Sequence, residues 1–201
     1  LYQQIKFQFG ANFQSVLDFF DNVVNESETY ASILNANILG FPQEGLRALD
    51  QLRQLRNRQY YPLILSAIHG GCDKSEVSEL VRQIASVAVR RALIGKNPNE
   101  LEAFFADNAP LLRKKQTTIL ELKNKLSENY WISDEDICEE IKTTNFEDQE
   151  YLSKFILREF EISKNPANEK TLGKVSLEHV LPRTPESIDD WNISPERHAD
   201  L

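Results

Sequence analysis

Apolar residues recur at helical spacing along most of the chain. The clearest early set follows the i, i+3, i+4, i+7 pattern of one helix face and consists of Phe13, Val16, Leu17 and Phe20. Comparable spacing predicts helices over about 1–24, 27–34, 43–56, 62–68, 75–94, 99–106, 117–129 and 147–164, with others beginning near 110 and 133. The broadest apolar stripe belongs to 75–94, so we expect that helix at the centre of the core.

Several residues suit the ends of these helices. We expect side-chain N-caps at Ser27, Ser75 or Ser78, Asn97 or Asn99, and Ser133, and first-turn prolines at Pro62 and Pro110. Gly70 is the expected C-cap of the helix that Pro62 opens, and His69 is expected to interact with the last carbonyls of that helix.

The one β-type run comes after these helices. Residues 174–182 follow a linker at 165–168, are preceded by Gly173 and are closed by Pro182. The expected fold is therefore mainly α, with a multi-helix domain over 1–168 and a strand-bearing segment over 169–201.

An acid and an imidazole, Glu178 and His179, stand side by side in this run. Histidine serves as a general base near neutral pH, and a carboxylate suits a hard divalent cation. The pair therefore suits a site that handles a water and a metal ion. The alternative is an ordinary solvated strand end.

Composition indicates a globular protein without a membrane span. The 201 residues are 41% hydrophobic and 27% charged, and no apolar run approaches the ~18 residues of a membrane span. No signal-peptide pattern opens the chain, and Cys72 and Cys138 lack metal-ligand spacing. We expect a cytoplasmic protein with free thiols.

The charge is uneven along the chain. A net charge of −8 argues against a generic nucleic-acid coat, and an excess of acids lies over 131–161. If DNA touches this chain, we expect contacts at two basic clusters: Arg47, Arg53, Arg56 and Arg58, and Arg82, Arg90, Arg91 and Lys96.

A longer string around the Glu-His pair favours an enzyme. Ser176-Leu-Glu-His-Val-Leu-Pro-Arg-Thr-Pro185, followed by Trp191, resembles the opening of the His-x-x-Pro form of the HNH (ββα-metal) nuclease module. That module lies at the C-terminus of the GmrSD-like modification-dependent restriction endonucleases. Two helical stretches also resemble that family: the paired-arginine segment 88–95 with 97–99, and the Trp-x-Ser-Asp-Glu string over 131–135.

The resemblance implies roles for individual residues. His179 would act as general base, Glu178 would bind Mg²⁺ or Mn²⁺, and Pro182 would end the strand. Arg183 stands where the family is expected to carry an amide, and it is a candidate contact to DNA phosphate. Arg90 and Arg91 would contact DNA or dock the nuclease module, and the alternative is a last helical turn that complements the helix dipole.

The resemblance also implies that DNA is the partner and that this chain is a fragment of a longer protein. The whole protein would cut modified foreign DNA in phage defence, with nucleotide hydrolysis in an N-terminal domain that has no match here. The nuclease module is truncated at Leu201, so we expect this fragment to be inactive. A homo-oligomer or a partner subunit is left open.

Two further function classes are weighed against the nuclease. The first is a non-catalytic helical scaffold or interaction domain. The second, an independent sequence-specific DNA-binding module, is disfavoured by the net charge and by the absence of a helix-turn-helix signal.

Overall fold

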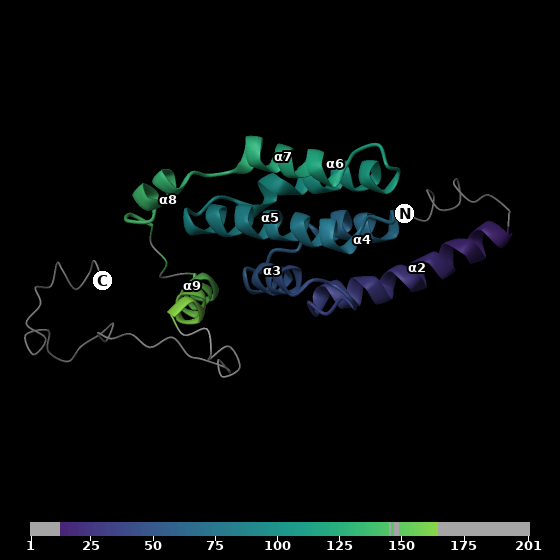
Figure 1. The fold of residues 1–201 in the computed structure, drawn as a ribbon, viewed down its shortest axis with the longest axis horizontal. Helices are drawn as coiled ribbons and strands as arrows, with labels where there is room; N and C mark the ends of the chain where they lie inside the picture. The colour runs from purple at the N-terminus through teal and green to yellow at the C-terminus, as the bar shows by residue number, and fades with distance from the viewer. Residues whose placement is uncertain (1–12, 145, 147–148, 165–201) are drawn as a thin grey trace, which may run out of the picture. The chain divides into compact units, whose positions relative to one another are not determined.

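The structure is a computed structural model that describes residues 13–144, 146 and 149–164. This part of the chain is mainly helical, as the apolar spacing predicts (Figure 1). Its elements are α2 (Phe13–Leu34), α3 (Gln43–Gln54), α4 (Tyr61–His69), α5 (Lys74–Leu93), the 3₁₀ helix η1 (Pro98–Leu101), α6 (Glu102–Arg113), α7 (Ile119–Tyr130), α8 (Asp134–Glu140) and α9 (Glu150–Lys164). The predicted strand at 174–182 and the predicted domain boundary at 168 lie outside the described residues.

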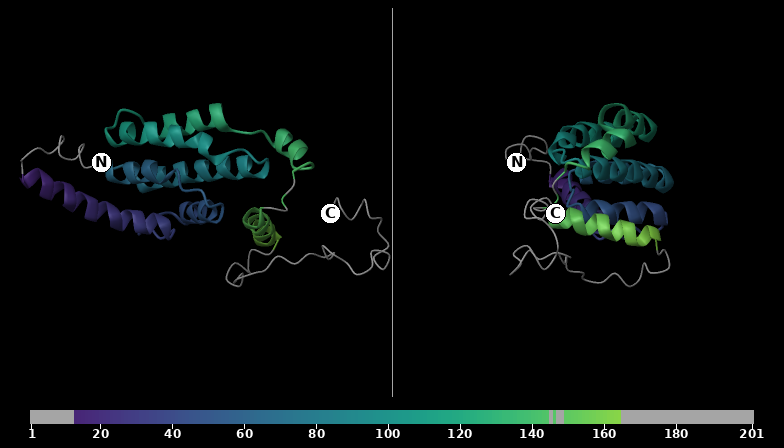
Figure 2. Two further views of the ribbon diagram at one scale, coloured as in Figure 1. Left: turned by 180° about the vertical axis from the view of Figure 1, so that it is seen from behind. Right: turned by 90° about the vertical axis from the view of Figure 1, so that its left-hand side faces the viewer.

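Helices two apart in the sequence stack on one another. The chain divides into two compact units, Leu1–Phe155 and Ile156–Leu201, and the packing described here is that of the first. In it α2, α4 and α6 follow one another in one column, while α3, α5 and α7 form a second. Figures 1 and 2 show α5 between α3 and α7. Stacked helix pairs of this kind are the architecture of α-solenoids.

Helix α5 is central to the core, which confirms the prediction from its apolar stripe. Its apolar side chains have no exposed surface at Val77, Leu80, Val81, Ile84 and Val87. These positions cover more than one face of the helix, so α5 needs apolar neighbours on several sides. It finds them in α3, α4 and α7.

Helix α2 differs from the prediction because it is a single helix. The Ser27 hydroxyl donates to the Val24 carbonyl at 2.6 Å, which is a bond within the helix and not an N-cap. No glycine or proline lies between Phe13 and Leu34, so nothing local stops the helix from propagating past Ser27.

The N-cap of helix α5 lies two residues before Ser75, the earlier of the two predicted caps. The carboxylate of Asp73 accepts from the Ser75 amide at 2.8 Å, so Asp73 is the N-cap and Ser75 lies inside the helix. Ser78 is also inside, and it is buried.

Pro110 lies inside α6 instead of opening a new helix. A proline in a helix interior costs about 3 kcal/mol. Burial of one large apolar side chain contributes about 1.5–3 kcal/mol. Buried side chains on both sides of Pro110 offset that cost by holding α6 in one piece: Phe104, Phe105, Ala109 and Leu112.

The end of α4 is partly as predicted. Gly70 is its C-cap, and the Gly70 amide donates to the Ser66 carbonyl at 2.8 Å. His69, however, does not interact with the last carbonyls: its Nε2 lies 3.1 Å from the Thr29 hydroxyl. His69 therefore connects α4 with α2.

Two predicted helix starts are confirmed by their hydrogen bonds. Asn97 caps η1, accepting from the Asn99 amide at 3.0 Å. The Ser133 hydroxyl caps α8, accepting from the Asp136 amide at 3.0 Å. None of the helices in the described ranges is both long enough and apolar enough to cross a membrane.

Two substitutions compare a helix cap with a serine inside a helix. Thr118 and Glu121 form a reciprocal capping box at α7, with the Thr118 hydroxyl accepting from the Glu121 amide at 3.2 Å. We expect Thr118→Ala to lower the free energy of unfolding by about 1 kcal/mol. Ser27→Ala, inside α2, should change it by less than about 0.5 kcal/mol. Urea unfolding followed by circular dichroism measures both. An equal loss in both variants would contradict the continuous α2.

An ion pair between α2 and α6 predicts a pH dependence. The guanidinium of Arg113 lies 2.5 Å from the Glu26 carboxylate and holds the pKa of Glu26 below its ordinary value of 4.5, helped by His69. A lowered pKa contributes stability above pH 4.5 that disappears as the pH falls through the lowered value. Arg113→Ala should therefore remove about 0.5–1 kcal/mol at pH 7 and less at pH 3. Urea unfolding at both pH values tests this, with Lys114→Ala as control. A difference that is the same at both pH values would contradict it.

Candidate functional site

The sequence-predicted catalytic residues lie outside the described residues. They are His179 as general base, Glu178 as metal ligand and Arg183 as phosphate contact. Of the predicted site residues the structure describes Arg90 and Arg91, both in the last turn of α5.

Arg90 holds the segment that leads into α8. Its guanidinium donates to the Ile132 carbonyl at 2.9 Å and lies 2.5 Å from the Asp134 carboxylate. Its Cζ also lies 4.0 Å from the centre of the Trp131 ring, a cation–π contact. The Arg90 side chain is 20% exposed. One guanidinium therefore contacts three of the four residues 131–134.

Arg91 points to a different neighbour and is buried. It forms a salt bridge with Glu100 of η1, and its Cζ lies 5.9 Å from the centre of the Tyr130 ring. Its side chain is 8% exposed. Arg91 would have to leave its salt bridge with Glu100 to reach DNA. The DNA contacts of Arg90 and Arg91 both stay predictions.

The acids at the start of α8 stabilise that helix. Asp134, Glu135 and Asp136 occupy its first turn, behind the Ser133 cap, where carboxylates interact favourably with the helix dipole. The part of the chain that the structure describes holds no group of three or more His, Cys, Asp or Glu side chains placed to bind a metal ion.

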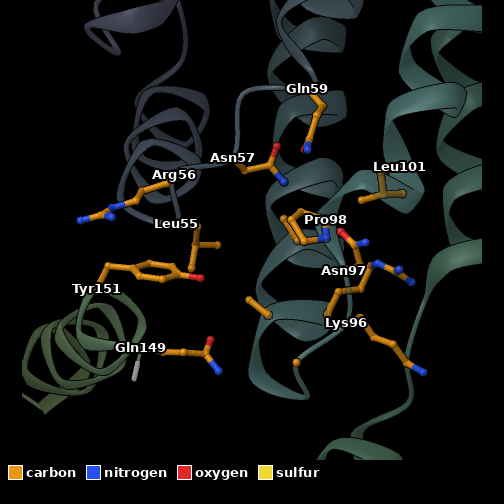
Figure 3. Close-up of a pocket in the computed structure, with 14 residues that line it drawn as sticks. Leu55, Arg56, Asn57, Gln59, Lys96, Asn97, Pro98, Leu101, Gln149 and Tyr151 are labelled. Atoms are coloured by element: carbon orange, nitrogen blue, oxygen red, sulfur yellow. The ribbon is translucent and has the colours of Figure 1, made fainter. Parts of the chain in front are cut away.

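A cavity of about 220 Å³ was not predicted by the sequence analysis. It lies beside Arg91, among the ends of α3 and α5, η1 and the start of α9 (Figure 3). We call it the Asn57 pocket, and it is lined by Leu55, Arg56, Asn57, Gln59, Ala88, Arg91, Ala92, Gly95, Lys96, Asn97, Pro98, Leu101, Gln149 and Tyr151.

Polar groups without partners mark this pocket. Asn57 is 7% exposed, and its Oδ1 has no hydrogen-bond partner, nor do Gln59 Oε1 and Arg91 Nε. The other end of the Gln59 amide donates to Asn99 Oδ1 at 2.8 Å. Buried polar groups are almost always paired, so unpaired ones at a cavity require an explanation. Asn57 looks like an ordinary loop asparagine in the sequence, because its burial arises only from tertiary packing.

A second, wider cavity of about 600 Å³ lies among α3, α5 and α8. It combines cations from both predicted basic clusters, Arg47, Arg82 and Arg90, with the acids Glu44 and Asp134. Opposite charges mix along its wall, so it has no single electrostatic preference.

No protein-family model, curated protein or solved structure matches this chain.

The contact between Arg90 and Trp131 can be measured directly. We expect a double-mutant cycle of Arg90→Ala and Trp131→Ala to give a coupling energy of about 0.5–1 kcal/mol, because the cation–π contact is partly exposed. Urea unfolding of the wild type, both single variants and the double variant supplies the four values. Strictly additive effects would mean that the two side chains do not interact.

Proposed function

We propose that this chain is part of a GmrSD-like, metal-dependent DNA endonuclease, consisting of its helical region and the start of its HNH nuclease module. One observation carries the proposal: the string from Ser176 to Pro185, in which the Glu178-His179 pair is followed by Leu181-Pro182. A Glu-His pair alone is common, and the added proline and flanking residues make the string more specific.

The contact made by Arg90 supports the proposal independently of that string. Two separate helical stretches resemble the same family, around Arg90 and around Trp131 to Asp134. Their side chains are in direct contact in the structure. If the resemblance marks one structural unit, its segments should meet, and these two do.

The chemistry follows from the residue types. His179 would take a proton from the water that attacks the phosphate. Glu178 would supply an oxygen ligand for Mg²⁺ or Mn²⁺, and the ion, when bound, would stabilise negative charge on the leaving oxygen. Arg183 would contact a phosphate of modified foreign DNA through its planar guanidinium.

A non-catalytic scaffold is the second candidate, and the two-column helix stack favours it. Stacked helix pairs build extended surfaces that commonly bind partners. In that case Glu178 and His179 would belong to an ordinary strand end. The two candidates differ in whether His179 is needed for DNA cleavage.

Cleavage of DNA by the protein expressed from its complete reading frame tests the proposal. The substrates are unmodified plasmid and modified phage DNA, with Mg²⁺ or Mn²⁺ and with nucleoside triphosphates present. We expect His179→Ala to lower the cleavage rate at least about 100-fold, because a positioned general base contributes roughly that much. His198→Ala is the matched control, since this histidine lies outside the His-x-x-Pro string.

The outcomes are distinct. Loss of cutting in His179→Ala, with an unchanged circular dichroism spectrum and full activity in His198→Ala, supports the nuclease. Equal cutting by His179→Ala, or no cutting by the wild type with either metal, would overturn it and leave the helical scaffold.

A further inference from the structure

We propose that the Asn57 pocket binds a phosphate group. The inference is independent of the proposed nuclease site, since it uses residues of the helical body alone. It rests on the charge of the pocket wall, on the hydrogen-bond donors that line it, including the unpaired Nε of Arg91, and on its size.

The wall contains cations and no carboxylate. Arg56, Arg91 and Lys96 line the pocket, and none of the acids in the described ranges does. This is unusual in a chain of net charge −8. A cavity lined by one sign of charge concentrates the field at its centre and favours a ligand of opposite sign.

Nearby negative charge does not cancel these cations. Glu100 neutralises Arg91. The C-terminal ends of α3 and α5 also adjoin the pocket, and each contributes about half a negative charge. Glu150 is close enough to interact with Arg56, but it pairs with Lys154 at 2.5 Å. About one positive charge therefore remains.

Hydrogen-bond donors surround the same space. Figure 3 shows the amide nitrogen of Asn57 on the side of Pro98, with its oxygen on the side of Gln59. The Tyr151 ring and the Gln149 side chain extend toward the same space from α9 and the residue before it (Figure 3). A phosphate oxygen is an acceptor and can take such donors, and charge-assisted bonds of this kind are stronger than neutral ones.

The size of the pocket limits the ligand. At about 220 Å³ it is smaller than the roughly 300–1,000 Å³ of sites for drug-sized molecules. It therefore suits a phosphate group with little attached. That group comes either from a free phosphate compound or from the backbone of a nucleic acid.

Asn57, whose amide oxygen is buried without a partner, provides a diagnostic variant. If Asn57 serves only the fold, replacing it should destabilise the protein. If its amide is kept for the nitrogen, which can donate to a ligand, removing the unpaired oxygen with it should stabilise the empty protein, because the desolvation cost of that oxygen disappears. Leucine has the same number of side-chain heavy atoms as asparagine, so Asn57→Leu should raise the Tm by roughly 2–4 °C in chloride buffer while weakening phosphate binding tenfold or more.

The test uses isothermal titration calorimetry and thermal unfolding of the full chain at constant ionic strength set with chloride. The probes are inorganic phosphate, deoxyadenosine monophosphate and a five-nucleotide single-stranded oligonucleotide without terminal phosphates. The variants are Asn57→Leu and Lys96→Glu. Lys114→Glu makes the same charge change at an exposed position that does not line the pocket.

We expect saturable binding of at least one probe in the wild type and in Lys114→Glu, weakened tenfold or more in Lys96→Glu and Asn57→Leu. Binding of the phosphate and the mononucleotide assigns the site to free phosphate compounds. Binding of the oligonucleotide alone assigns it to a nucleic-acid backbone. No saturation by any probe, equal weakening in Lys114→Glu, or unchanged binding in both pocket variants would overturn the proposal. None of these experiments measures DNA cleavage. A negative result here would therefore overturn the phosphate site without bearing on the role proposed for His179.

Discussion

The burial of α5 is the constraint on which the described structure depends. Each of its fully buried valine, leucine and isoleucine side chains contributes about 1.5–3 kcal/mol, but only if apolar neighbours exclude water on every side. A single flanking helix covers too little of so broad a stripe. The chain therefore places α3 and α7 against α5 in one column, and the short α4 bridges to the other column.

The same burial fixes the two arginines at the end of α5. The side chains of consecutive helix residues point about 100° apart, so Arg90 and Arg91 contact different neighbours. Arg90 reaches the segment before α8, and Arg91 reaches η1. Arg91 also forms part of the wall of the Asn57 pocket. A rigid helix thus sets the geometry of two functional candidates at once, and a shift of α5 would move both.

Local patterns predicted the helices well and their junctions less well. Repeated apolar spacing reports burial directly, which is why α5 was predictable. The Ser133 start of α8 was predictable from its local N-cap signal. Ser27 and Pro110 carry the usual signals for helix starts, but packing over longer stretches outweighs those signals. His69 finds Thr29 and Asn57 is buried only through tertiary contacts, and a single sequence does not display them. The Glu178-His179 pair is the reverse case: its string is visible in the sequence, and its geometry lies outside the described residues.

Net charge is a poor guide to where phosphate can bind on this chain. At physiological ionic strength the potential of an exposed charge falls off over about 8 Å. A phosphate in the Asn57 pocket would therefore respond to Arg56, Lys96 and the Arg91–Glu100 pair, and only weakly to acids elsewhere on the chain. The first-turn acids of α8 are partly offset as well, since Arg90 pairs with Asp134. An acidic protein can therefore hold a locally positive site, provided that no carboxylate enters its wall. That condition is met at the Asn57 pocket, while Glu44 and Asp134 prevent it at the wider cavity beside α8.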